Sequence, residues 1–307
     1  MHPMVNVALA AARKAGEIIV RAADRIDLVE VRRKSGSDYV TEVDVAAERE
    51  IIFHLRKAYP DHEFLAEEGT AGSPPTGSSP YRWLIDPLDG TTNFSRGIPH
   101  FAVSIACLKE GRIEHAVVVD PVRREEFTAT RGAGAQLNGK RLRVTTRGLT
   151  QDALLATGIP FRGSSNALMS PYMDTLQQLA ERTAGIRRAG VAALDLAYVA
   201  AGRFEGFWEI GLQPWDIAAG ALLVQEAGGL VSDFEGGNDW LESGDIVASN
   251  PKCLKPMLQV IRPLLGAAAR KAMQEAQGAS LAVFSSFTGS IRSCRSRPSQ
   301  SESAEAM

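Results

Sequence analysis

The alternation of hydrophobic and polar positions predicts helices first and strands afterwards. Two stretches near the N-terminus, at about 4–23 and 44–58, have the apolar spacing of amphipathic helices, and Pro60 stops the second. Strand-like runs EFLA and YRWLI follow. From Phe101 to Val144 the chain consists of short β-rich runs (FAVSIACL, HAVVVD, EEFTAT and RLRV), with an Asn138-Gly139 hairpin signal. This part of the chain therefore predicts an antiparallel sheet.

Strand-like and helix-like stretches alternate again after about residue 150. The runs ALLATG, FEGFWEI, LVSDF and DIVAS are strand-like. Helices are expected at 169–182, at ALDLAYVAAG, at WDIAAGALLVQEAGG and from Lys252 onward. This mixed order predicts layered sheets and helices in two subdomains, an α+β half at 1–148 and an α/β half at 149–266, rather than one doubly wound sheet.

Two segments have a composition typical of unstructured chain. The first, at 69–80, directly follows the acidic pair Glu67 and Glu68, and is either a mobile flap over a site or a plain surface loop. The second is the C-terminal extension at 267–307, which has few core-forming residues. We expect it to be largely disordered and not catalytic.

Charge and cysteine content exclude several classes of protein. The formal net charge is −2, from 34 basic and 36 acidic residues, so no global field favours nucleic acid or an anionic membrane surface. The three cysteines are scattered and form neither a disulfide framework nor a zinc motif. Charged residues interrupt the N-terminal apolar stretch, so it is neither a signal peptide nor a membrane span. We expect a cytoplasmic protein with no membrane partner.

The run WLIDPLDGTTN has the features of a site for a cation and a phosphate. It reads as a buried strand that ends at Asp86, a corner fixed by Pro87, and a helix that starts at GTTN. Asp86 and Asp89 would repel each other unless a cation lay between them, and such hard oxygen ligands suit Mg²⁺. Free backbone N–H groups at the helix start favour a phosphate.

Each acid taken singly has a structural alternative, since Asp89 could be an N-cap and Asp86 a turn carboxylate. These alternatives leave Glu67 and Asp216 unexplained, although both also stand at the start or end of an element. Four such acids indicate one metal cluster. No Ser/His/Asp order or Cys/His pairing favours a covalent mechanism, so we expect direct attack by water.

The runs DPLDGTTNF and WDIAAGALLVQEAGG resemble the two signatures of the inositol monophosphatase family. The resemblance covers roughly residues 4–265, including DYVTEVDVAAE at 38–48 and AEEG at 66–69, and leaves only the tail outside. It implies a layered αβαβα sandwich of the inositol monophosphatase and fructose bisphosphatase type. It also implies Mg²⁺-dependent, Li⁺-sensitive hydrolysis of phosphate monoesters and a homodimer.

The resemblance further implies two Mg²⁺ ions, with Glu67 also able to hold a weaker third. Glu67, Asp86 and the backbone carbonyl of Leu88 would surround one ion. Asp86, Asp89 and Asp216 would surround the other. This arrangement agrees with two-metal chemistry, in which one ion lowers the pKa of a water and the other stabilises the departing alkoxide.

Water orientation and substrate recognition are assigned by the same resemblance. It implies a Thr91–Asp44 pair that orients the water and accepts its proton, and Asp44 could also be the N-cap of the following helix. Glu209 would accept hydrogen bonds from ring hydroxyls, and its alternative is a solvated acid at a strand end. Arg187 would supply local positive charge. The full set of implied substrate contacts is Asp89, Gly90, Thr91, Arg187, Gly190, Val191, Ala192, Glu209 and Asp216.

The metal signatures fix the reaction better than the substrate, because fructose-1,6-bisphosphatases and related phosphatases share them. Chain length, Glu209 and the run RRAGVAALDLAYVAAGRFEGFWEIGL look like bacterial inositol-1-monophosphatases of the SuhB type, so myo-inositol 1-phosphate is the expected substrate. Proteins of that type can also be binding subunits of ribosomal RNA antitermination complexes with Nus factors and RNA polymerase. The sequence allows both roles, although its near-neutral charge gives no RNA-binding footprint.

Overall fold

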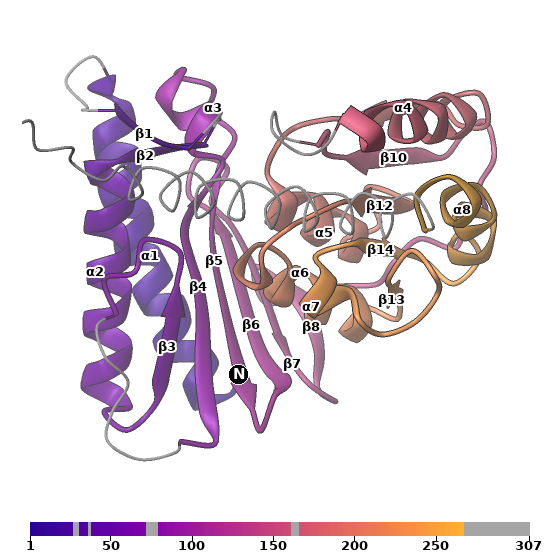
Figure 1. Cartoon of the computed structure of the whole chain (residues 1–307). Coiled ribbons are helices and arrows are strands. Elements are labelled where there is room, and N and C mark those ends of the chain that lie inside the picture. The colour runs from indigo at the N-terminus through magenta and orange to yellow at the C-terminus, as the bar shows by residue number, and fades with distance from the viewer. Residues whose placement is uncertain (27–30, 36–37, 72–78, 161–165, 267–307) are drawn as a thin grey trace, which may run out of the picture.

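The protein is built of five alternating layers of helix and sheet. The computed structural model describes residues 1–26, 31–35, 38–71, 79–160 and 166–266. Helices α1 and α2 cover the outer face of a seven-stranded sheet, and α5 and α6 lie between this sheet and a five-stranded one (Figure 1). Helices α4 and α8 cover the far side of the second sheet. The expected layered αβαβα arrangement is therefore confirmed.

The first layer consists of two long helices, α1 (Pro3–Ala23) and α2 (Glu42–Ala58), close to the predicted ranges. Thr41 is the N-cap of α2, and its side chain accepts from the backbone N–H of Val43 and Asp44. The Asp44 carboxylate accepts from the Thr41 N–H at 2.8 Å in return, which completes a capping box. The suggestion that Asp44 is itself the N-cap is therefore wrong, because it stands three residues inside the helix.

The seven-stranded sheet has the strand order β3-β4-β5-β6-β7-β8-β9, with only β3 and β4 parallel. Asn138 and Gly139 have φ values of 49° and 77° and form the predicted hairpin turn between β8 and β9. The predicted strand RLRV is shorter than expected, since only its start pairs, as β9. The strands are β3 (Glu63–Ala66), β4 (Tyr81–Asp89), β5 (Ala102–Lys109), β6 (Arg112–Asp120), β7 (Glu125–Thr130), β8 (Gly134–Leu137) and β9 (Lys140–Arg141).

Side-chain alternation along this sheet produces two separate cores. On β5, Val103, Ile105 and Cys107 belong to the core with α1 and α2. Ala102 and Ala106 belong to the core with α5 (Ala192–Ala200) and α6 (Pro214–Glu226). Both faces of the strand are thus buried, which explains why its sequence is apolar at nearly every position.

The second sheet has the order β11-β10-β12-β14-β13 and is mixed. Strand β10 is parallel to both β11 and β12, while β14 is antiparallel to β12 and β13. Leu155, Trp208 and Val247 pack against the outer helices. The elements are β10 (Leu154–Thr157), α4 (Asn166–Ala180), β11 (Gly185–Arg187), β12 (Gly206–Glu209), β13 (Leu230–Ser232), β14 (Ile246–Ser249) and α8 (Leu254–Ile261).

Five short elements were not predicted: strands β1 (Val31–Ser35) and β2 (Asp38–Thr41), which pair as a hairpin, strands β8 and β11, and helix α7 (Trp240–Ser243). The expected flap at 69–80 lies largely outside the described residues, and so does the extension at 267–307. Within the described parts of the chain, no helix combines the length and apolar character needed to cross a membrane.

Candidate functional site

An irregularity in β4 turns Asp86 and Asp89 toward the same face of the large sheet. The strand does not end at Asp86 as expected but continues through Pro87 to Asp89. Asp86 pairs with Ser104 and Asp89 with Ala102, so three steps on β4 match two steps on β5. Proline has no N–H to donate and is tolerated at such a bulge. Because Ser104 and Ala102 are two residues apart, their partners share one face, the one covered by α5 and α6.

The chain leaves β4 through Gly90, whose φ of 99° lies in the left-handed region. A Cβ here would also lie 2.8 Å from the Val191 Cγ2 atom, so glycine is required for both reasons. Gly90 is the N-cap of the short helix α3 (Thr91–Ser95). The alternative role of Asp89 as that cap is therefore wrong. Its Oδ2 atom instead accepts a hydrogen bond of 2.7 Å from the backbone N–H of Ala193, in the first turn of α5.

The four predicted metal acids are electrostatically coupled in the structure. Burial raises the pKa of Asp86 well above its usual range, and the charges of Glu67, Asp89 and Asp216 raise it further. The pKa of Asp89 is also raised well above its usual range, first by burial and then by Asp216, while the hydrogen bond from Ala193 opposes the shift. Residues from the turn after β3, from β4 and from α6 thus form one acidic cluster, although 149 positions separate Glu67 from Asp216 in the chain.

The chemistry of the cluster fits a hard divalent cation. Its donors are carboxylate oxygens whose mutual repulsion a cation would relieve. The Leu88 N–H donates to Asp86 Oδ1 at 2.9 Å and fixes this carboxylate in the bulge. Among the described residues, however, no three His, Cys, Asp or Glu side chains are spaced to hold one ion. The acids are therefore neighbours whose oxygens a bound cation would have to draw closer together.

Thr91 and Asp44 are in direct contact, as the resemblance implied. The Thr91 hydroxyl lies 2.9 Å from Asp44 Oδ1 and 3.1 Å from the Leu88 carbonyl oxygen. Its single hydrogen can be donated fully to only one of them. Burial raises the pKa of Asp44, while hydrogen bonds from Thr41 and Thr91 oppose the shift. The Asp44 carboxylate on α2 is thus held rigidly against the hydroxyl of Thr91, which directly follows residues 86–90.

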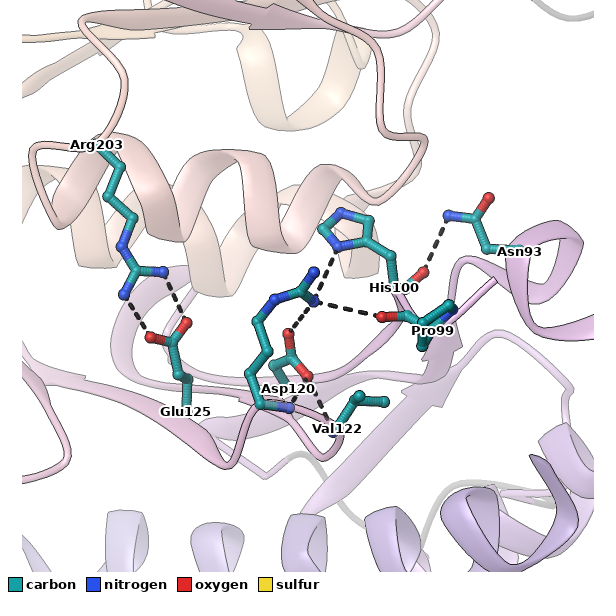
Figure 2. A network of polar contacts seen from close by, with 8 residues as sticks. Asn93, Pro99, His100, Asp120, Val122, Glu125 and Arg203 are labelled. Carbon is teal, nitrogen blue, oxygen red and sulfur yellow. Dashed lines mark hydrogen bonds and ion pairs between the residues drawn. The ribbon is translucent and has the colours of Figure 1, made fainter. Parts of the chain in front are cut away.

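The α3 turn is tied to the segment from the other half of the chain that was predicted to bind the substrate. The Asn93 amide nitrogen donates to the carbonyl oxygens of His100 and Ala189, both at 2.9 Å. Figure 2 shows Asn93 reaching His100. Arg123 donates to Asp120, His100 and the Pro99 carbonyl. The buried Asp120 carboxylate anchors this arginine. These contacts fix the position of residues 189–193 relative to the acids.

Glu209 is buried at the end of β12. Its exposed fraction is 8%, so the alternative of a solvated strand-end acid is wrong. Burial raises its pKa to about 8, Asp216 raises it too, and Arg188 opposes the shift. A Cβ on Gly158 would lie 1.6 Å from Glu209 Oε1, so only glycine leaves room for this carboxyl group. Glu209 therefore lies close enough to Asp216 for the charge of Asp216 to affect it, at the edge of the acidic cluster.

The positive charge of Arg188 acts on Glu209 and on a second acid, Asp195. Its charge lowers the pKa of both Glu209 and Asp195, against the effect of burial. Both arginines are exposed. Arg187, which was expected to supply the charge, donates weakly from its Nη1 to the Ile186 carbonyl at 3.4 Å. Arg187 remains a candidate substrate contact, and Arg188 is a second candidate.

Asp195 is an acidic residue of this region that the sequence reasoning missed. It is 1% exposed, and neither of its carboxylate oxygens has a hydrogen-bond partner in the structure. Burial and the charges of Glu209 and Asp89 raise its pKa well above the usual range. The available signal was a lone acid inside the apolar run ALDLAYVAA, which is unusual in a fully buried helix.

Comparisons with known proteins give a consistent result over most of the chain. A family model described as the inositol monophosphatase family matches residues 1–268. The protein named Nus factor SuhB from Pseudomonas aeruginosa is 59% identical over 265 residues, which are 86% of this chain and 98% of that protein. Nus factor SuhB from Escherichia coli is 52% identical over 271 residues, 88% of this chain and 100% of that protein.

Solved structures agree with the sequence relatives. The extragenic suppressor protein suhB from Bartonella henselae is 44% identical, with a TM-score of 0.80, over 86% of this chain and 98% of that one. An IMPase from Thermotoga maritima is 33% identical, with a TM-score of 0.77, over 87% of this chain and 100% of that one. The coupled acids, the Thr91–Asp44 contact and these matches lead to one conclusion: the chain belongs to the inositol monophosphatase family.

Proposed function

We propose that this protein hydrolyses the phosphate monoester of a small polyol, with myo-inositol 1-phosphate as its substrate and Mg²⁺ as its cofactor. The observation that carries the proposal is the contact between the Thr91 hydroxyl and Asp44 beside a partly buried cluster of mutually repelling carboxylates. Repelling acids indicate a cation. The adjacent hydroxyl and carboxylate can orient a water and take up its proton.

Each group has a defined part in this reaction. Glu67, Asp86, the Leu88 carbonyl, Asp89 and Asp216 would hold the metal ions. Bound Mg²⁺ supplies a water of lowered pKa and stabilises the leaving alkoxide. Thr91 accepts a hydrogen bond from the attacking water and passes its own proton toward Asp44 Oδ1, 2.9 Å away.

Recognition of the polyol falls to the turn that Asn93 holds against α3. Gly190, Val191 and Ala192 present backbone groups there, and Glu209 faces the same region from β12. A carboxyl group whose pKa is about 8 is mostly protonated at pH 7, so its O–H can donate a hydrogen bond to one hydroxyl while its other oxygen accepts one from a neighbour. A group that donates and accepts at the same time can bind two neighbouring hydroxyls of a polyol.

Purified protein should release phosphate from myo-inositol 1-phosphate only when Mg²⁺ is present. Addition of EDTA should stop the release, excess Mg²⁺ should restore it, and Li⁺ should inhibit it. A panel of sugar and polyol monophosphates, compared by kcat/KM, identifies the preferred substrate. If no monophosphate in the panel is hydrolysed at any Mg²⁺ concentration, the proposed activity is wrong.

We infer a second role from the names of the relatives. Two proteins more than half identical over nearly their full length are called Nus factor SuhB, which favours an association of this chain with the transcription machinery. Such a role requires a surface for partners. It does not depend on an intact metal centre. A cytoplasmic location and a homodimer agree with both roles and stay predictions.

The two roles can be separated with one variant. Tagged wild-type protein and Asp86→Asn, each incubated with bacterial extract, should recover the same Nus factors and RNA polymerase subunits, because the substituted residue is 2% exposed and cannot contact a partner directly. Immunoblots and mass spectrometry measure the recovery. Absence of these proteins from both samples would contradict the binding role and leave the hydrolytic one intact.

A further inference from the structure

A buried glutamate on α2 binds the turn that carries Glu67. Glu48 is fully buried, and each of its two carboxylate oxygens accepts one backbone hydrogen bond. Oε2 accepts from the N–H of Glu68 and Oε1 accepts from the N–H of Thr70, both at 2.6 Å. These donors lie 20 and 22 residues further along the chain. The contact therefore joins two separate elements.

Backbone contacts also hold the turn that carries Glu67. The Glu67 N–H donates to the Ile85 carbonyl at 3.1 Å, which continues the pairing of β3 with β4. Gly69 has a φ of 71°, and its N–H donates to the Ala66 carbonyl at 3.2 Å, which closes the turn. Further along, Arg56 donates to the Ala71 carbonyl at 2.6 Å. Glu48 adds two side-chain hydrogen bonds to this turn, at the two residues Glu68 and Thr70 that follow Glu67.

The chemistry of this contact requires a carboxylate. Two N–H donors converge on the side chain, and a carboxylate presents an acceptor oxygen to each of them. A glutamine of the same shape would present one oxygen and one NH₂ group, so one buried N–H would face another donor. The position is therefore selective for glutamate over its closest analogue.

Helix α2 also holds the other side of the candidate site. Asp44 and Glu48 are four residues apart, so they lie on the same face of the helix, about 6 Å apart along its axis. Asp44 contacts Thr91, which directly follows residues 86–90. Glu48 contacts the backbone of Glu68, the residue after Glu67. One rigid helix thus sets the distance between the proton acceptor and the turn bearing a metal ligand.

We propose that Glu48 is a positioning residue, which holds Glu67 where it can bind Mg²⁺ through its hydrogen bonds to the backbone of Glu68 and Thr70. The inference rests on the proposed function, because it assigns Glu67 to the metal. Groups that orient a metal ligand typically change metal affinity by about 10- to 100-fold when removed. The effect should therefore appear in Mg²⁺ affinity rather than in general stability.

The test compares Mg²⁺ binding by the full-length wild-type protein and by Glu48→Gln. Isothermal titration calorimetry without substrate should show Mg²⁺ affinity reduced about tenfold. The Mg²⁺ concentration for half-maximal phosphate release should rise by the same factor, while kcat at saturating Mg²⁺ changes by less than about threefold. Glu50→Gln is the matched control. It lies on the same helix, contacts His54 and not the turn, and should behave as the wild type.

A double substitution shows whether the effect passes through Glu67. If it does, Glu48→Gln combined with Glu67→Gln should bind Mg²⁺ no more weakly than Glu67→Gln alone, because the single substitution has already removed the group being positioned. Additive losses would overturn the inference, as would unchanged Mg²⁺ affinity in Glu48→Gln. If Glu48→Gln does not fold, Glu48→Asp replaces it, since it keeps both oxygens but withdraws them by one methylene. A wild-type protein without Mg²⁺-dependent activity overturns the proposed function instead.

Discussion

Asp86→Asn is expected to abolish Mg²⁺-dependent phosphate release without weakening the fold. Asparagine keeps one carbonyl-type oxygen, which can still accept the hydrogen bond from the Leu88 N–H. It removes a charge that lies beside Glu67, Asp89 and Asp216 in a buried position. Asp86 is assigned to both metal ions, so each ion would lose a charged ligand in this variant. Loss of several kcal/mol of metal stabilisation corresponds to a fall in kcat of about a thousandfold or more.

Two measurements on Asp86→Asn separate catalysis from folding. Steady-state phosphate release gives kcat, and thermal unfolding with and without Mg²⁺ gives stability. We expect an unfolding temperature without Mg²⁺ at least equal to that of the wild type, because the repulsion is relieved, and no further rise on addition of Mg²⁺. Asp245→Asn is a matched control, since Asp245 is also a buried aspartate that accepts a backbone hydrogen bond, from Gly211. Undiminished hydrolysis in Asp86→Asn would exclude the two-metal mechanism.

Thr91→Val is expected to reduce kcat by about 10²- to 10⁴-fold, the usual contribution of a positioned proton acceptor. Valine matches threonine in shape but lacks the hydroxyl that contacts Asp44 and the Leu88 carbonyl. Asp44→Asn should lower kcat to a similar degree. It should also lower stability by about 1 kcal/mol, because the same carboxylate completes the capping box with Thr41.

The comparison of these two variants identifies the function of the pair. If Thr91 and Asp44 act as a unit, the double variant should be no slower than either single one. Thr92→Val is the control, since Thr92 lies in the same turn but is exposed. KM for the substrate should change little, because the proposed part of the two side chains is to orient the water, and the backbone of Thr91 is kept in both variants. A loss of affinity with unchanged kcat would show that the pair binds the substrate instead.

Periodicity and motif spacing predicted the helices, most strands and the layered architecture, because these depend on local patterns. The sequence predicted that the carboxylates of Asp86 and Asp89 lie close together, but not the backbone feature that brings them together. The sequence suggested a corner at Pro87, whereas a bulge in a continuous strand aligns the two acids. Bulges depend on the pairing partner, which local sequence does not reveal. The Asp44 error was avoidable, since Thr41 and Asp44 have the spacing of a capping box.

Contacts across long sequence separations explain the remaining differences. The burial of Glu209, the bond from Ala193 to Asp89 and the bonds from Glu68 and Thr70 to Glu48 arise only when distant elements pack. In the sequence, Glu48 looks like an ordinary helical acid. Asp195 gave a local signal, a single acid in an apolar helix, but its neighbours could not be named before the fold was known.

The layer formed by α5 and α6 has a consequence for synthesis on the ribosome. The large sheet is complete once β9 has formed, yet its inner face is covered by helices that come much later in the chain, up to Glu226. While those residues are still being translated, side chains such as Phe127 and Val118 on that face have no permanent neighbours. Nascent chains are therefore most exposed to aggregation and to chaperones during this interval, before the inner face of the sheet is covered.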